Sequence, residues 1–266
     1  MKRAHAVLVG LALLAPTVGS AQDGGGVEVI CNGPSDQVPL GVSAIIPFVS
    51  LIVGGPTGSG VGDLSRCITP VGKMFRLDAS FISPWGTGDV TATMNPDPFI
   101  TFGATTTNLI AGPVTYAFIF GTPIVPGLYT SATSTGGVSV TNGASGTTTV
   151  TTSPIYPTYI SGYGTVGGAP TNLGVDLGTT ACVAGPAAPF TETETCNYGT
   201  AVNSFAPTFY DNLEALLTYN QDDVGSVASW SGAVTLSAVP EPASLALVGT
   251  GVLLVGAGGY ARRRRS

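Results

Sequence analysis

Histidine is almost missing from this 266-residue chain: it occurs once, at His5, and none follows. A Ser-His-Asp triad, a Cys-His pair, a His-ligated zinc and a facial-triad iron therefore cannot be assembled from the residues beyond it. Carboxylate pairs remain as a catalytic option, as in glycosidases and aspartic proteases. No D-T-G or D-S-G string, which would indicate an aspartic protease, occurs in the sequence. We expect no enzymatic activity and no cofactor.

Basic residues are scarce between the two ends of the chain. From Gln22 to Val239 the sequence holds Arg66, Lys73 and Arg76 against fourteen acids, which gives −11, compared with −6 for the whole chain. Nucleic acid and anionic lipid head groups are bound by clustered Lys and Arg. We therefore exclude nucleic acid as a partner and expect an acidic surface that favours solubility outside the cell.

Cysteine is also sparse, and C-x-x-C spacing is missing, which argues against a thiolate metal site. The four cysteines allow three disulfide connectivities. We favour Cys31–Cys67 and Cys182–Cys196, because each pair lies within its own loop-rich stretch. Disulfides are typical of an exported protein.

Long amphipathic helices, heptads and fixed-period repeats are missing as well. The body is rich in Gly, Thr, Ser, Val and Pro, and turn residues recur about every ten positions. This texture predicts an all-β fold, an antiparallel β-sandwich or jelly-roll-like domain. One segment favours a short helix: residues 211–214 have capping-box spacing, and Phe209, Leu213, Leu216 and Leu217 would share a face. A strand would instead group Leu213, Ala215, Leu217 and Tyr219.

Four segments are predicted to be strands. Residues 114–120 are almost wholly apolar, so we expect a strand buried on both sides that stops at 121–123, with Pro126-Gly127 marking the next turn. Residues 138–141 and 147–151 flank an Asn-Gly bend and predict a hairpin. Residues 233–239 alternate strictly between apolar and polar. The Gly, Ser and Thr bias of residues 130–152 therefore indicates ordered strands, whose hydroxyls either carry O-linked sugar or simply face solvent.

Two groups of side chains are candidate ligands. Asp222 and Asp223 lie in an expected turn and could bind calcium, although the EF-hand pattern is missing; solvated acidic turns are the commoner interpretation. The aromatic side chains could stack on sugar rings or cover the edges of the core. These aromatic residues are Trp85, Tyr156, Tyr159, Tyr163 and Trp230.

The N-terminus has the order of a signal peptide. Lys2, Arg3 and His5 form a basic region, and residues 6–14 are apolar. Small residues precede a cleavage point that we place between Ala21 and Gln22. Everything after that point is expected to cross the membrane.

The C-terminus has three parts in sequence. Pro240, Glu241 and Pro242 come first, then an uncharged stretch of 19 residues from Ala243 to Ala261, then the four arginines Arg262, Arg263, Arg264 and Arg265. As a helix the stretch spans about 28 Å, close to the hydrocarbon thickness of a bilayer. The arginines act as a stop-transfer signal that stays in the cytoplasm. We expect a transmembrane helix.

These three parts together resemble the PEP-CTERM sorting tail of Gram-negative bacteria. The resemblance implies recognition by an exosortase, a membrane-embedded cysteine protease that processes the protein during export. It also implies association with exopolysaccharide or biofilm. It covers residues 239–266 and says nothing about the chemistry of the body.

The sequence thus predicts three regions: a signal peptide at 1–21, an extracytoplasmic β-sandwich at 22–238 and a sorting tail at 239–266. The expected protein is exported through an inner-membrane intermediate to the cell surface or the extracellular space. Its expected partners are the secretion machinery, an exosortase and, before processing, the membrane. The function we favour is that of a non-enzymatic surface or matrix protein. The alternative is a carbohydrate-binding module for exopolysaccharide.

Overall fold

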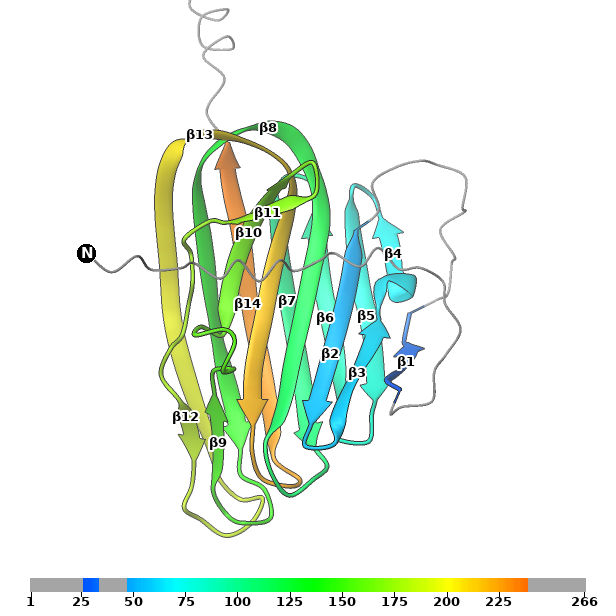
Figure 1. Cartoon of the computed structure of the whole chain (residues 1–266), viewed down its shortest axis with the longest axis vertical. Helices are drawn as coiled ribbons and strands as arrows, with labels where there is room; N and C mark the ends of the chain where they lie inside the picture. The colour runs from blue at the N-terminus through cyan, green and yellow to red at the C-terminus, as the bar shows by residue number, and fades with distance from the viewer. Residues whose placement is uncertain (1–25, 34–46, 239–266) are drawn as a thin grey trace, which may run out of the picture.

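The computed structural model describes residues 26–33 and 47–238, and these form an antiparallel β-sandwich (Figure 1). This confirms the all-β prediction. The described part has no helix long and apolar enough to cross a membrane. Its elements are β1 (Glu28–Cys31), β2 (Phe48–Gly55), β3 (Gly58–Asp63), the 3₁₀ turn η1 (Ser65–Cys67), β4 (Ile68–Val71), β5 (Met74–Ile82), β6 (Gly86–Asn95), β7 (Phe99–Asn108), β8 (Val114–Thr141), β9 (Thr148–Thr151), β10 (Ile160–Val166), β11 (Ala169–Asn172), β12 (Cys182–Ala184), β13 (Thr193–Gln221) and β14 (Val227–Ala238).

Two very long strands, β8 and β13, each belong to both layers of the sandwich. The second half of β8 pairs with β14 and with the first half of β13, and β14 continues through β7 and β6 to β5. We call this layer the first sheet. The first half of β8 pairs with β2 and with the second half of β13, which pairs with β10. We call this layer the second sheet.

The long strands change layers at proline-containing bends. β8 passes through Pro123 and Pro126, and β13 passes through Pro207, where its pairing with β8 shifts register twice. The expected stop at residues 121–123 is therefore wrong. The chain bends there and continues as one strand, because proline removes only a single ladder donor and a bend tolerates that loss.

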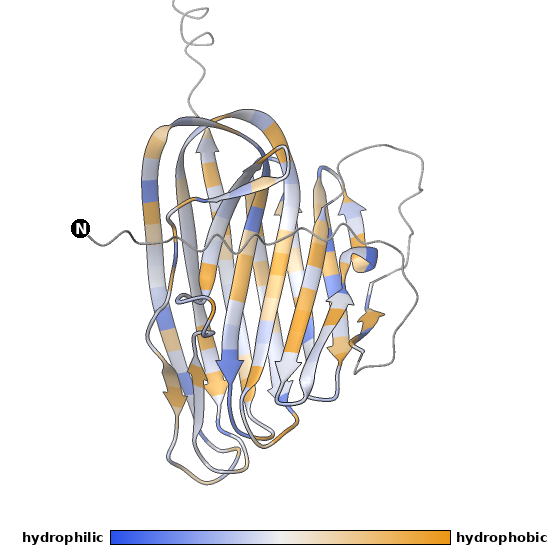
Figure 2. Cartoon of the chain, viewed as in Figure 1, coloured by the Kyte–Doolittle hydropathy of each residue, from blue (hydrophilic) through white to orange (hydrophobic). Residues whose placement is uncertain are grey.

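Alternating side chains of the two sheets meet in the core. From the second sheet, Phe118 and Phe120 point inward, and Phe120 stacks on Phe102 of β7 with ring centroids 5.0 Å apart. Tyr219 of β13 lies 5.1 Å from Trp230 of β14. Figure 2 shows the resulting alternation of hydrophobic and hydrophilic residues along the strands. In residues 114–120 one face is fully buried and the other only partly, so the expectation of burial on both sides holds for one face.

Two local expectations are wrong. Residues 211–217 form β13 rather than a helix, because the alternation of Leu213, Ala215 and Leu217 fits the core face of a sheet. Residues 138–141 and 148–151 are strands, but they do not pair with each other as a hairpin. The former pair with β13 and β14, and β9 pairs with β12 and the end of β13. Tertiary pairing here outweighs the Asn-Gly turn signal.

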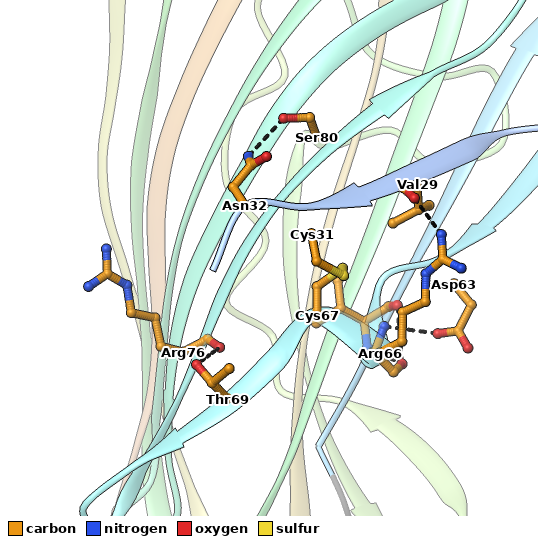
Figure 3. The surroundings of a disulfide bond; sticks show 11 residues. Val29, Cys31, Asn32, Asp63, Arg66, Cys67, Thr69, Arg76 and Ser80 are labelled. Carbon is orange, nitrogen blue, oxygen red and sulfur yellow. Dashed lines mark hydrogen bonds between the residues drawn. A yellow bond between two sulfur atoms is a disulfide. The ribbon is translucent and has the colours of Figure 1, made fainter. Parts of the chain in front are cut away.

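Both disulfides of the favoured pairing are present. Cys31 of β1 is joined to Cys67 of η1, and Cys182 of β12 is joined to Cys196 of β13. Around the first bridge, the Arg66 guanidinium donates to the carbonyl oxygen of Val29 (Figure 3). The bridge and this hydrogen bond fix the short strand β1 at the edge of the first sheet.

Candidate functional site

The residues of the expected sorting tail and of the signal cleavage lie outside the described residues. They are Pro240, Glu241, Pro242, Arg262, Arg263, Arg264, Arg265, Ala21 and Gln22. β14 runs to Ala238. The sandwich therefore ends immediately before the tail, with no spacer between them.

The aromatic candidates divide into core and surface. Trp85 and Trp230 are only 6% and 3% exposed, and Tyr159 is fully buried. Their rings cannot stack on a sugar in solution, and the core reading is correct for them. Tyr156 and Tyr163 are half-buried and do not share a platform with either tryptophan.

The calcium candidates Asp222 and Asp223 tie loops together. A carboxylate oxygen of Asp222 accepts from the backbone N–H of Thr149, and the Asp223 carboxylate accepts from the N–H of Ser145 at 3.1 Å. Within residues 26–33 and 47–238, no three or more His, Cys, Asp or Glu side chains are grouped as metal ligands. These carboxylates serve the architecture of the turn between β13 and β14.

Sequence reasoning missed a buried carboxyl group, Glu214, on the outer face of the second sheet. Its side chain is 8% exposed and accepts hydrogen bonds from the Thr165 hydroxyl at 2.9 Å and the Asn212 amide at 3.2 Å. Tyr163 lies directly opposite it in the register. Burial raises the pKa of Glu214, and the two hydrogen bonds oppose that rise. The apolar neighbours Leu213 and Ala215 gave no sign in the sequence that this acid would be buried.

Replacing Glu214 with Gln tests this burial. The pKa of Glu214 is higher in the folded chain than in the unfolded chain. Ionisation of this carboxyl group therefore lowers the stability of the fold once the pH rises above the unfolded pKa. Gln keeps an oxygen for Thr165 and Asn212 but never ionises. We expect a gain on the order of 1 kcal/mol at pH 7.5, which is about 2–4 °C in Tm, shrinking toward pH 4. Calorimetry across that range measures it. A gain that does not change with pH would contradict the assignment.

The outer face of the first sheet is covered by hydroxyl side chains, and we call it the hydroxyl face. Directly paired residues of neighbouring strands share a face of a sheet. Three adjacent rows run across β6, β7, β14, β8 and β13. The first row is Asp89, Thr105, Ser229, Ser139 and Thr195; the second is Thr91, Gly103, Ser231, Gly137 and Asn197; the third is Thr93, Thr101, Ala233, Thr135 and Thr200.

The middle row forms a furrow, because the residues on either side of Ser231 in this row are Gly103 and Gly137, which have no side chains. Two shallow hollows lie along it. One, of about 570 Å³, lies at the β4–β5 end and is lined by Met74, Phe75 and Arg76 as well as by Thr91, Thr101 and Gly103. The second, of about 490 Å³, is lined by Gly137, Ser231 and residues around them. Five strands at about 4.8 Å spacing make the furrow about 19 Å long.

Charge on the outer face of the first sheet is confined to its β5–β6 edge, where Ser80, Asp78 and Arg76 of β5 continue the three rows. Of the fifteen positions in the three rows of the hydroxyl face, only Asp89 is charged, although the body as a whole is acidic. Some hydroxyls already bond across strands, as Thr105 does to Ser229 at 3.2 Å. The alternation of Thr and Ser was visible in the sequence, but the alignment of five such strands depends on long-range pairing.

Comparison with known proteins identifies the tail. Residues 238–265 match the family model for the PEP-CTERM protein-sorting motif. The resemblance stated from sequence is therefore confirmed, and it marks the chain as an exported protein addressed to an exosortase. No curated protein matches the chain.

Solved structures give only distant similarities. The structure of TmCBM61 in complex with β-1,4-galactotriose is 8% identical over 58% of this chain and 89% of that chain, with a TM-score of 0.23. A structure of infectious bursal disease virus, Gt strain, is 12% identical over 82% of this chain and 65% of that chain, with a TM-score of 0.15. These values are too low to support a functional argument.

Proposed function

We propose that this chain is a non-enzymatic protein of the cell surface or extracellular matrix, exported behind its signal peptide, held by its tail and then processed by an exosortase. The observation that carries the proposal is the sorting motif at residues 238–265, which follows β14 without a spacer. A disulfide-bonded, acidic sandwich is suited to conditions outside the cell.

Neutralising the arginine cluster tests the proposal. With Arg262, Arg263, Arg264 and Arg265 all replaced by Gln, the tail loses its stop-transfer signal. We expect most of the protein to be misoriented or released unprocessed. Intact-mass measurement of the membrane and secreted fractions measures this. The matched control replaces Lys73 and Arg76, which are exposed basic residues of the body, and should leave processing unchanged. A wild-type surface form that still ends at Ser266 would contradict processing.

The hydroxyl face favours a second candidate function, binding of an uncharged polysaccharide. Its rows offer many hydroxyl donors and acceptors along a shallow furrow, and charged side chains are confined to its β5–β6 edge, at Arg76, Asp78 and Asp89. Several weak hydrogen bonds repeated along a polymer can give useful avidity.

A shape-conserving substitution tests this candidate. Thr91, Thr101 and Thr135, all changed to Val, lose three hydroxyls and keep the surface contour. At about 0.5–1.5 kcal/mol per hydrogen bond, we expect about tenfold or more weaker retention in gels containing neutral galactomannan or hydroxyethylcellulose. Thr171→Val, on β11, is the control. Equal retention of both variants and wild type would show that the hydroxyl face is not used.

A further inference from the structure

Three bends meet at the end of the sandwich where the described chain finishes. They are the β6–β7 turn (95–99), residues 123–128 of β8 and residues 205–209 of β13, and we call them together the proline-rich end. The N–H of Val125 donates to the carbonyl oxygen of Pro96 at 3.0 Å, and Leu128 pairs with Phe209. Ala238, the last residue of β14, pairs with Tyr129. Figure 1 shows the arrowhead of β14 at the same end as the bends of β8 and β13.

This end exposes apolar side chains. Val125 is 63% exposed, Leu128 52% and Phe209 45%. Five prolines occupy the three bends: Pro96, Pro98, Pro123, Pro126 and Pro207. Proline carries no N–H, so these bends have fewer backbone donors that must stay hydrated, and the desolvation cost of contact with the head-group region is lower. Asp97 is the one charged side chain in the three bends; it is exposed, and its carboxylate stays among the hydrated head groups.

The short length of chain beyond Ala238 determines which end of the sandwich lies next to the membrane. Five residue steps separate Ala238 from Ala243, the first residue of the uncharged stretch, and they span at most about 18 Å. The opposite end of the sandwich lies much farther away, because β14 (Val227–Ala238) extends over about 36 Å. While the tail is in a bilayer, only the proline-rich end is within its reach.

We propose that the proline-rich end is a membrane-contact surface, which rests on the lipid head-group region while the tail is inserted and holds the sandwich upright. Val125, Leu128 and Phe209 enter the interface, where apolar side chains of peripheral proteins are buried about 5–10 Å deep. The inference rests on the proposed function, because it requires an inserted tail. It adds the orientation of the domain: the turn between β13 and β14 points away from the membrane, and the hydroxyl face stands perpendicular to it.

A matched pair of Phe→Trp substitutions tests the orientation. Phe209 lies at the proline-rich end. Phe190 lies at the opposite end, near Gly225 in the turn before β14, and is 59% exposed. The unprocessed chain is purified in detergent and reconstituted in phosphatidylcholine vesicles that include lipid with a head-group nitroxide. Zwitterionic lipid avoids repulsion of the acidic body. The buried Trp85 and Trp230 give a constant background that the parent chain measures.

We expect the fluorescence of F209W above that background to be quenched at least about twofold more strongly than that of F190W, because head-group contact is confined to one end. Changing Val125 and Leu128 to Ser in the F209W chain should reduce this quenching, with Tm unchanged because both side chains are exposed. Equal quenching of the two Trp variants, or stronger quenching of F190W, overturns the orientation. Flotation of the vesicles distinguishes failure of the contact surface from failure of the proposed function. A chain that does not float with the vesicles overturns the membrane-anchored intermediate as well. A chain that floats but shows equal quenching of F209W and F190W overturns only the contact surface.

Discussion

An Asn142→Ala variant is expected to lose about 3–5 kcal/mol of stability, since buried partners left without a hydrogen bond cost about 1–3 kcal/mol each. Asn142 is fully buried at the end of β8. Its amide donates to the carbonyl oxygens of Gly146 and Ala188, and its carbonyl oxygen accepts from the N–H groups of Thr191 and Glu192. One side chain thus joins the β8–β9 loop to the β12–β13 loop. Ala would leave the N–H groups of Thr191 and Glu192 without partners, whereas the carbonyl oxygens of Gly146 and Ala188 still accept from the Ala187 N–H and the Thr191 hydroxyl.

Urea unfolding of the oxidised protein measures the loss. Asn197→Ala is the control: that side chain is exposed and accepts a single hydrogen bond from the N–H of Gly199, so we expect little change. If both variants unfolded at the same urea concentration, the loop-tying role of Asn142 would be refuted.

A Trp230→Ala variant is expected to lose a similar amount, about 3–5 kcal/mol, the usual cost of truncating a large aromatic side chain in a core. The Trp230 ring lies 4.9 Å from that of Tyr159, 5.1 Å from Tyr219 and 6.0 Å from Tyr198. The substitution therefore removes the centre of an aromatic cluster and leaves a cavity between the sheets.

Trp230→Phe separates packing from hydrogen bonding. The indole N–H of Trp230 is buried and has no hydrogen-bond partner. Phe removes that unpaired donor and keeps most of the ring contacts, so we expect less than half the loss of the Ala variant, measured by the same urea titration. If Trp230→Phe lost as much stability as Trp230→Ala, the conclusion that the indole N–H has no hydrogen-bond partner would be contradicted. In either case, loss of ligand binding on Trp230→Ala would report unfolding rather than a sugar site.

The class of fold and the disulfide pairing could be predicted from local signals. Thr, Val and Gly texture with regular turns indicates short strands, and each cysteine pair lay within one loop-rich stretch. The second half of β14 followed from the strict alternation of residues 233–239, although the strand begins earlier, at Val227. The sorting tail could be recognised because its three parts are contiguous in the sequence, so that the match at residues 238–265 requires no knowledge of the fold.

What could not be predicted depends on contacts between distant residues. Pro123 and Pro126 indicated the end of a strand, because the sequence does not show that β8 continues after the bend by pairing with strands of the other sheet. Leu213 and Leu217 fitted a helix face as well as a sheet face until β8 and β10 supplied their neighbours. The hydroxyl face and the burial of Glu214 both arise from alignment of strands separated by many residues.

The position of β14 has a consequence for how the domain matures. β14 lies between β7 and β8 in the middle of the first sheet, yet in the proposed export it is the last of the described strands to leave the channel. Until it arrives, β5, β6 and β7 have no ladder connecting them to the second half of β8. Such pairing between distant segments is slow to nucleate. We therefore expect the sandwich of the exported chain to stay incompletely folded, and accessible to proteases and chaperones, until residue 238 has emerged.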